Sequence, residues 1–146
     1  MNKRTALLAL AAAASLPLLV ACASSMSNVA SADKAPPLRV TGSVTFRERI
    51  ALDPSAEIVV QLLDVSRMDV AAVVLAEQRI RANGKQVPFS FALSVDPARI
   101  DPRMRYNVSA RILEGDKLLF ISDTAYPVLT QGRGNTADLM LVRASR

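Results

Sequence analysis

The chain has 146 residues, a length typical of one domain, and its 18 basic and 13 acidic residues give a formal net charge of +5. It has no histidine and one cysteine, so no Ser-His-Asp or Cys-His catalytic arrangement and no disulfide can form within it. The basic residues are scattered and the aromatic residues are four phenylalanines and two tyrosines, which argues against nucleic-acid binding.

An apolar segment of signal-peptide length opens the chain. Lys3 and Arg4 precede the uncharged stretch ALLALAAAASLPLLV at positions 6–20, an order that is typical of a secretory signal peptide. The stretch is shorter than the about 20 apolar residues that a membrane-spanning helix needs. Because small residues follow it directly, we predict that residues 1–21 are a signal peptide.

The only cysteine lies where this apolar segment ends. Residues 19–22, Leu-Val-Ala-Cys, resemble the bacterial lipobox, in which the cysteine thiol receives diacylglycerol and the leader is cleaved before it. The resemblance implies cleavage after Ala21, lipidation of Cys22 and acylation of the new amine, for example with palmitate. Membrane lipid is then the first expected partner, and each buried methylene contributes about 0.8 kcal/mol to the anchor. The alternatives are an ordinary signal peptide with a free or buried cysteine, or an N-terminal helix.

Residue 23 is alanine rather than aspartate. In enteric-type bacteria an aspartate there resembles an inner-membrane retention signal, so its absence favours an outer-membrane lipoprotein that faces the periplasm. Small polar residues and prolines dominate positions 23–37, which have too few apolar side chains to pack. We therefore predict a lipidated N-terminus and flexible tether at 22–37, with a reach of about 20 Å, and a folded domain at 38–143.

Within that domain the apolar residues recur mostly at every second position, as in half-buried strands. The expected strands are 38–46, 57–65, 73–82, 86–95, 103–114, 117–123 and 135–143. The fourth has the clearest alternation, and the fifth is expected to bury Met104, Tyr106, Val108, Ala110 and Ile112. A helical turn is conceivable only at 64–74.

Turn residues separate these strands. Asn83-Gly84 follows the third strand and is a strong hairpin signal, which predicts that the third and fourth strands pair. Pro88 lacks a backbone donor, so the fourth strand is expected to lie at an edge or to contain a bulge. Short strands with frequent turns predict an all-β fold, a small antiparallel β-sandwich of about seven to eight strands, immunoglobulin-like or an irregular barrel.

Three aspartates could in principle supply a pair of catalytic carboxylates. Asp53, Asp96 and Asp101 each precede a proline, where aspartate commonly begins a turn, so we interpret them as turn residues. Their loops lack the D-x-D-x-D-G spacing of a calcium site, and the glycine-rich QGRGN at 131–135 lacks the spacing of a phosphate-binding loop. We expect no catalytic residues, no metal ligands and no cofactor.

Arginines recur on the polar face of the expected fifth strand. Arg103, Arg105 and Arg111 alternate with Asn107 and Ser109 on the side away from the core. Arginine pairs well with carboxylates and phosphates, so these three residues could bind an acidic partner segment or lipid head groups. The alternative is a solvated sheet face whose charges protect an edge.

The order of strand sequences and turns resembles the YbaY family of bacterial lipoproteins, which is similar to the YscW type III secretion lipoprotein chaperones, or pilotins. The resemblance covers 38–142. The segments that carry it are VTGSVTFRERIALDPSAEIVVQLLDVS, AEQRI, VPFSFALSVDPARIDP and YNVSARILEGDKLLFISDTAYPVLTQG. It implies a small β-sandwich at the outer membrane and, in the secretion branch, assistance to a secretin.

Taken together, the sequence predicts a non-enzymatic outer-membrane lipoprotein that binds an envelope or secretion protein in the periplasm. A pilotin-like chaperone is the sharper form of this hypothesis. The alternative is an envelope enzyme or enzyme inhibitor that acts on glycan or peptidoglycan, which would need a cleft with converging polar groups. The oligomeric state is left open.

Overall fold

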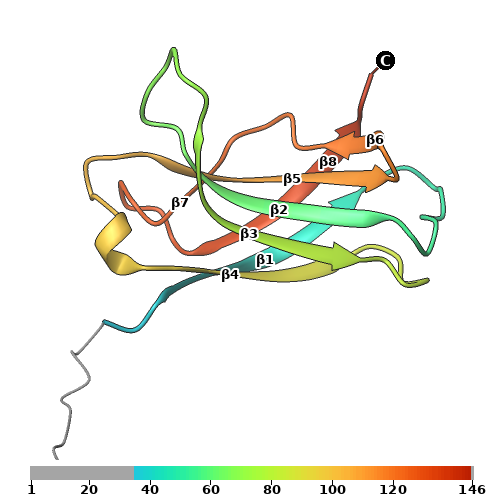
Figure 1. The fold of residues 1–146 in the computed structure, drawn as a ribbon, viewed down its shortest axis with the longest axis horizontal. Coiled ribbons are helices and arrows are strands. Elements are labelled where there is room, and N and C mark those ends of the chain that lie inside the picture. The colour runs from blue at the N-terminus through green and yellow to red at the C-terminus, as the bar shows by residue number, and fades with distance from the viewer. Residues whose placement is uncertain (1–34, 146) are drawn as a thin grey trace, which may run out of the picture. The chain divides into compact units, whose positions relative to one another are not determined.

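A computed structural model describes residues 35–145, so the predicted signal peptide, Ala21, Cys22 and most of the predicted tether lie outside the described residues. The described residues form eight strands and one 3-10 turn (Figure 1). The strands are β1 (Leu38–Phe46), β2 (Glu57–Asp64), β3 (Val73–Arg81), β4 (Phe89–Val95), β5 (Tyr106–Glu114), β6 (Lys117–Ile121), β7 (Tyr126–Val128) and β8 (Thr136–Arg143), and η1 (Pro97–Arg99) follows β4. No helix in 35–145 has the length and hydropathy to cross a membrane.

All strands belong to one curled sheet in the order β3-β2-β5-β6-β8-β1-β4, with β7 paired to the start of β5 (Figure 1). The predicted all-β fold is confirmed, in a form close to the irregular barrel. The pairs are antiparallel except β1 and β8, which run parallel. That exception was not predicted, and it joins the first and last strands of the domain.

The two edge strands, β3 and β4, are joined by side chains in place of a ladder. The Ala92 N–H of β4 donates to Gln78 Oε1 of β3 at 2.8 Å. Arg99 Nη1, just after β4, donates to the Leu75 carbonyl of β3 at 3.0 Å. These bonds satisfy backbone groups that an open edge would present to another chain, so they protect the seam against unwanted strand pairing.

The predicted hairpin between β3 and β4 is wrong, although its turn is present. Asn83 and Gly84 have φ values of 48° and 79°, and the Lys85 N–H donates to the Ala82 carbonyl at 2.8 Å, as in a type I′ turn. Beyond the turn the chain leaves β3, and β4 pairs with β1. As predicted from Pro88, β4 is an edge strand.

The Gln86 side chain holds the chain in its path away from β3 after the turn. Gln86 Oε1 accepts from the Leu52 N–H at 2.9 Å, and Gln86 Nε2 donates to the Leu52 carbonyl at 3.3 Å. The amide thus ties the β3–β4 connection to the β1–β2 connection. The expected alternation in β4 is confirmed, since every second residue from Phe89 to Val95 is buried.

The core lies inside the curled sheet. Phe46 of β1 and Phe120 of β6 stack with ring centroids 4.2 Å apart, and the apolar face of β5 is buried as predicted from Tyr106 to Ile112. Met104 is instead 38% exposed. Because the Met104 N–H donates to the Asp101 carbonyl at 2.9 Å, this segment forms a turn, and β5 begins only at Tyr106.

Candidate protein-binding surface

Exposed apolar side chains gather at the end of the domain where β2 ends and β3 begins. Met68 is 88%, Val70 59%, Val73 56% and Met104 38% exposed. We call these four residues the apolar end patch. Val70, Val73 and Met104 also line a hollow of about 400 Å³, whose other lining residues are Ala71 and the polar Asp64, Ser66 and Arg67. Clustered exposed apolar residues commonly mark an interaction site, because leaving them in water has no benefit for folding.

The patch depends on the connection 65–72, which projects away from the sheet (Figure 1). At its base the Ser66 N–H and hydroxyl donate to Asp64 Oδ1 at 2.9 and 2.5 Å, so the carboxylate fixes the bend after β2. The Arg105 N–H donates to Ser66 Oγ at 2.9 Å, and the Val65 N–H donates to the Arg105 carbonyl at 2.9 Å. These bonds place Met104 against the connection.

The sequence pattern did not predict this patch. At 64–74 the sequence allowed a helical turn, whereas the structure has the end of β2, an irregular connection and the start of β3. A usable signal was present, since Met68 and Val70 are apolar residues in a segment that continues neither strand's alternation.

The three predicted arginines do not form one row. Arg103 and Arg105 precede β5, whereas Arg111 lies within it. Arg103 is paired with Asp101: its Nη2 lies 2.8 Å from Oδ2, and its Nε donates to Oδ1 at 3.1 Å. Arg105 lines a separate hollow with Tyr106. A role of these arginines in binding a partner stays a prediction.

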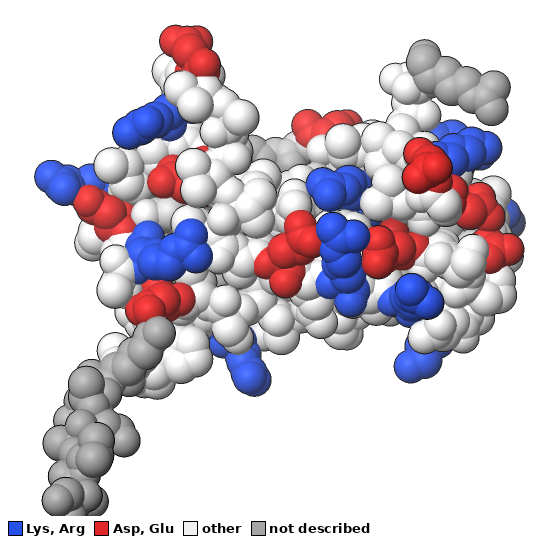
Figure 2. All heavy atoms as spheres, in the orientation of Figure 1, with Lys and Arg blue, Asp and Glu red and all other residues white. Residues whose placement is uncertain are grey.

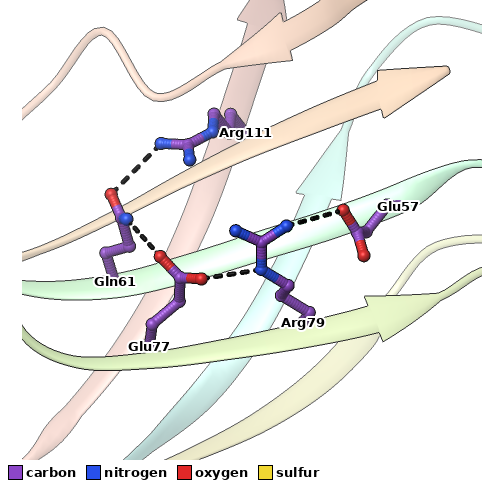
Figure 3. A network of polar contacts seen from close by, with 5 residues as sticks. All are labelled: Glu57, Gln61, Glu77, Arg79 and Arg111. Carbon is purple, nitrogen blue, oxygen red and sulfur yellow. Dashed lines mark hydrogen bonds and ion pairs between the residues drawn. The ribbon is translucent and has the colours of Figure 1, made fainter. Parts of the chain in front are cut away.

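Arg111 belongs to a polar network on the outer face of β3, β2 and β5 (Figure 3). The network comprises Glu57, Gln61, Glu77, Arg79 and Arg111. Over β2 and β3, acidic and basic side chains alternate, and this face of the domain has no broad area of one charge (Figure 2). Hydrogen bonds from Gln61 and Arg79 lower the pKa of Glu77 below its ordinary value, so the network favours the ionised carboxylate.

The network also covers an apolar side chain. Val59 of β2 is 1% exposed although its register partners on the two sides are Arg79 and Arg111, which point outward. The aliphatic parts of such long side chains cover apolar neighbours while their charged groups stay in water. Arg111 therefore has a structural role in the isolated domain.

The three aspartates behave as turn residues, as interpreted from the sequence. Each accepts a hydrogen bond from the backbone two residues later: Asp53 from Ser55, Asp96 from Ala98, and Asp101 from Arg103, at 2.8 to 3.0 Å. The Asp96 interaction caps η1. Their geometry is that of the Asx turn.

The ion pair between Asp101 and Arg103 should be visible in the titration of the Asp101 carboxyl. Side-chain and backbone hydrogen bonds from Arg103 lower the pKa of Asp101 from 3.8 to about 2. Because the folded-state pKa is lowered, the stabilisation is present above the unfolded value and is lost as the pH falls through about 2. NMR of the Asp101 side-chain carboxyl carbon should show a titration midpoint near pH 2, and Arg103→Gln should raise that midpoint toward 3.8. An unchanged midpoint in the variant would contradict the assigned cause.

Residues 35–141 match the sequence profile of a family described as type III secretion system lipoprotein chaperone, YscW. The chain belongs to the YscW family. The uncharacterized lipoprotein YbaY of Escherichia coli K12 resembles this YscW-family chain with 48% identity over 103 residues, which are 70% of this chain and 54% of YbaY. The chain thus spans about half the length of this curated relative.

A solved structure supports the YscW-family fold. The alternative pilotin from the type II secretion system of Vibrio cholerae is similar with a TM-score of 0.72 and 43% sequence identity. The match covers 75% of this chain and 99% of that chain. The predicted resemblance to YbaY and to YscW-type pilotins is confirmed.

Proposed function

We propose that this protein is a non-enzymatic outer-membrane lipoprotein that acts as a pilotin, binding a secretin or another secretion protein in the periplasm. The observation that carries the proposal is the similarity of the described domain, over nearly the full length of the other chain, to the alternative pilotin of the Vibrio cholerae type II secretion system. The family profile, described as a lipoprotein chaperone, supports the same role.

The apolar end patch is the surface that we assign to the partner. Its four residues are attached to a base that is fixed by backbone hydrogen bonds, so the patch is presented on a defined support. The occupant is an apolar segment of the secretion protein, because Met68 and Val70 offer methyl and thioether groups that adapt to apolar side chains. The three aspartates that form turns give no comparable candidate for a catalytic site.

The membrane anchor is Cys22. The described chain begins at the end of the domain that carries the patch: Ala35 and Pro37 lie beside Asp96 and Pro97, and Arg99 of that segment reaches Leu75 of β3. A tether of about 15 residues reaches about 20 Å, so an anchor at Cys22 would keep the patch near the outer membrane.

Replacing Cys22 with alanine tests this proposal. Without a thiol no diacylglycerol can be attached, so the variant should leave the outer-membrane fraction, and the secretion protein it serves should accumulate outside that membrane. Fractionation of both proteins and intact mass of the purified chain provide the readout. Native protein with the mass of the bare polypeptide, or a variant that still fractionates with the outer membrane, would contradict the anchor.

A further inference from the structure

We propose that a second hollow beside the apolar end patch binds a carboxylate of the partner protein through Arg105 and Arg133. This inference rests on the proposed function, and it specifies the partner's chemistry as an acidic group next to apolar residues. The hollow has a volume of about 270 Å³ and lies between the start of β5, β7 and the connection 129–135.

The lining of this hollow is basic and polar. Its polar members are Arg105, Asn107, Thr130, Gln131 and Arg133, and no acidic residue lines it. Among the ion pairs within residues 35–145, none involves Arg105 or Arg133. Arg103, by contrast, is paired with Asp101. Two guanidinium groups without an acidic partner can form paired hydrogen bonds to a carboxylate.

The backbone of both arginines is held in place. The Arg105 N–H donates to Ser66 Oγ, and its carbonyl accepts from the Val65 N–H. The Arg133 N–H donates to the Thr130 carbonyl at 3.1 Å, while the Thr130 hydroxyl donates to the Met104 carbonyl at 2.7 Å. The last bond joins the connection 129–135 to the segment before β5, so the two arginines are carried by attached segments.

The connection that carries Arg133 has an unusual backbone. Leu129 and Gln131 have φ values of 70° and 57°, a left-handed conformation that costs energy for residues other than glycine. The Leu129 N–H donates to the Gly134 carbonyl at 2.8 Å, which closes the loop. Backbone strain of this kind concentrates at functional sites, and here it lies at the wall of the basic hollow.

The basic hollow and the apolar end patch lie on two sides of the same pair of segments. Val65 and Arg105 line the basic hollow, whereas their chain neighbours Ser66 and Met104 line the hollow at the apolar end patch. The apolar end patch on the neighbouring residues offers contacts to apolar side chains. A peptide segment with both acidic and apolar side chains suits the two sites together, so we assign the carboxylate to a protein rather than to a lipid phosphate.

Calorimetry with two capped peptides tests the inference on the purified full-length protein. Both peptides have the same leucine-rich sequence, but one has glutamates where the other has glutamines. We expect the glutamate peptide to bind about tenfold more tightly. Arg105→Gln with Arg133→Gln should remove that difference, whereas the control Arg103→Gln should retain it. Thermal unfolding of the double variant confirms that it is folded.

The outcomes separate this inference from the proposed function. If neither peptide binds the native protein, the apolar end patch and the carboxylate site are both wrong. If both peptides bind equally, only the carboxylate site is wrong. Phosphatidylglycerol vesicles form the third arm: if the double variant loses vesicle binding as strongly as it loses the glutamate preference, the hollow binds lipid head groups and the inference is overturned.

Discussion

Alanine in place of Gly42 should destabilise the domain by at least about 3 kcal/mol. A Cβ atom at this position would lie 1.7 Å from the Ala137 carbonyl oxygen and 3.0 Å from the Phe91 ring. Gly42 pairs with Ala137 across the parallel β1–β8 ladder, so relief requires moving the strand that closes the sheet. Thermal unfolding should show a loss of about 12 °C or more.

Gly134→Ala is the matched control for this prediction. No atom lies within 4 Å of the Cβ that alanine would add there, and Gly134 is absent from the residues with positive φ. The control should therefore unfold within a few degrees of the native protein. A Gly42→Ala variant that unfolds at the same temperature as the control would show that β1 and β8 do not approach as closely as described.

Exchanging Met68 and Val70 for aspartate should weaken binding of the secretion protein by at least about thirtyfold. A carboxylate at the centre of an apolar contact loses its hydration without gaining a partner. The fold should be unaffected, because the two side chains are 88% and 59% exposed. Quantitative co-purification of the secretion protein from solubilised outer membranes measures the effect.

Ile50→Asp provides the comparison for this double variant. Ile50 is 39% exposed and lies in the β1–β2 connection, at the opposite end of the domain (Figure 1). It adds one carboxylate at an apolar surface position outside the apolar end patch, so it should leave binding unchanged. Equal losses in the two variants would mean that charge alone, rather than the apolar end patch, governs the association.

Most strands could be predicted because the apolar residues of each recur at a spacing that lets them be buried together only in an extended strand. In β4 the residues Phe89, Phe91, Leu93 and Val95 can all be buried only as a strand, and they are. Which neighbouring strand it pairs with has no such local signal in the sequence. Asn83-Gly84 specified the turn, yet β4 pairs with β1, since curling the sheet buries its apolar face.

The shortest strand was missed for a related reason. β7 has three residues, and Pro127 occupies its centre, so no periodic pattern could identify it. Its position depends on contacts distant in sequence: the Tyr126 hydroxyl accepts from the Met140 N–H at 2.8 Å and donates to the Met140 carbonyl at 3.2 Å. The Tyr126 side chain thus makes the two backbone hydrogen bonds to Met140 that a neighbouring strand would otherwise make.

The candidate site was predicted only in part. Arg105 was expected on the surface and is exposed, but the expected arginine row assumed a strand from residue 103. The turn at Asp101 ends that pattern, because its carboxylate accepts from the Arg103 N–H. Met68 and Val70 interrupt the alternation of both flanking strands, but apolar composition alone does not distinguish a buried segment from a projecting one.

Photo-crosslinking in living cells is the sharpest test of whether the apolar end patch binds a secretion protein. With benzoylphenylalanine in place of Met68 in the lipidated full-length protein, we expect a covalent adduct with a secretin or another secretion protein, identified by mass spectrometry. The same group at Ile50 should give no such adduct. An adduct from neither position, or the same adduct from both, would contradict the claim that this end of the domain holds a secretion partner.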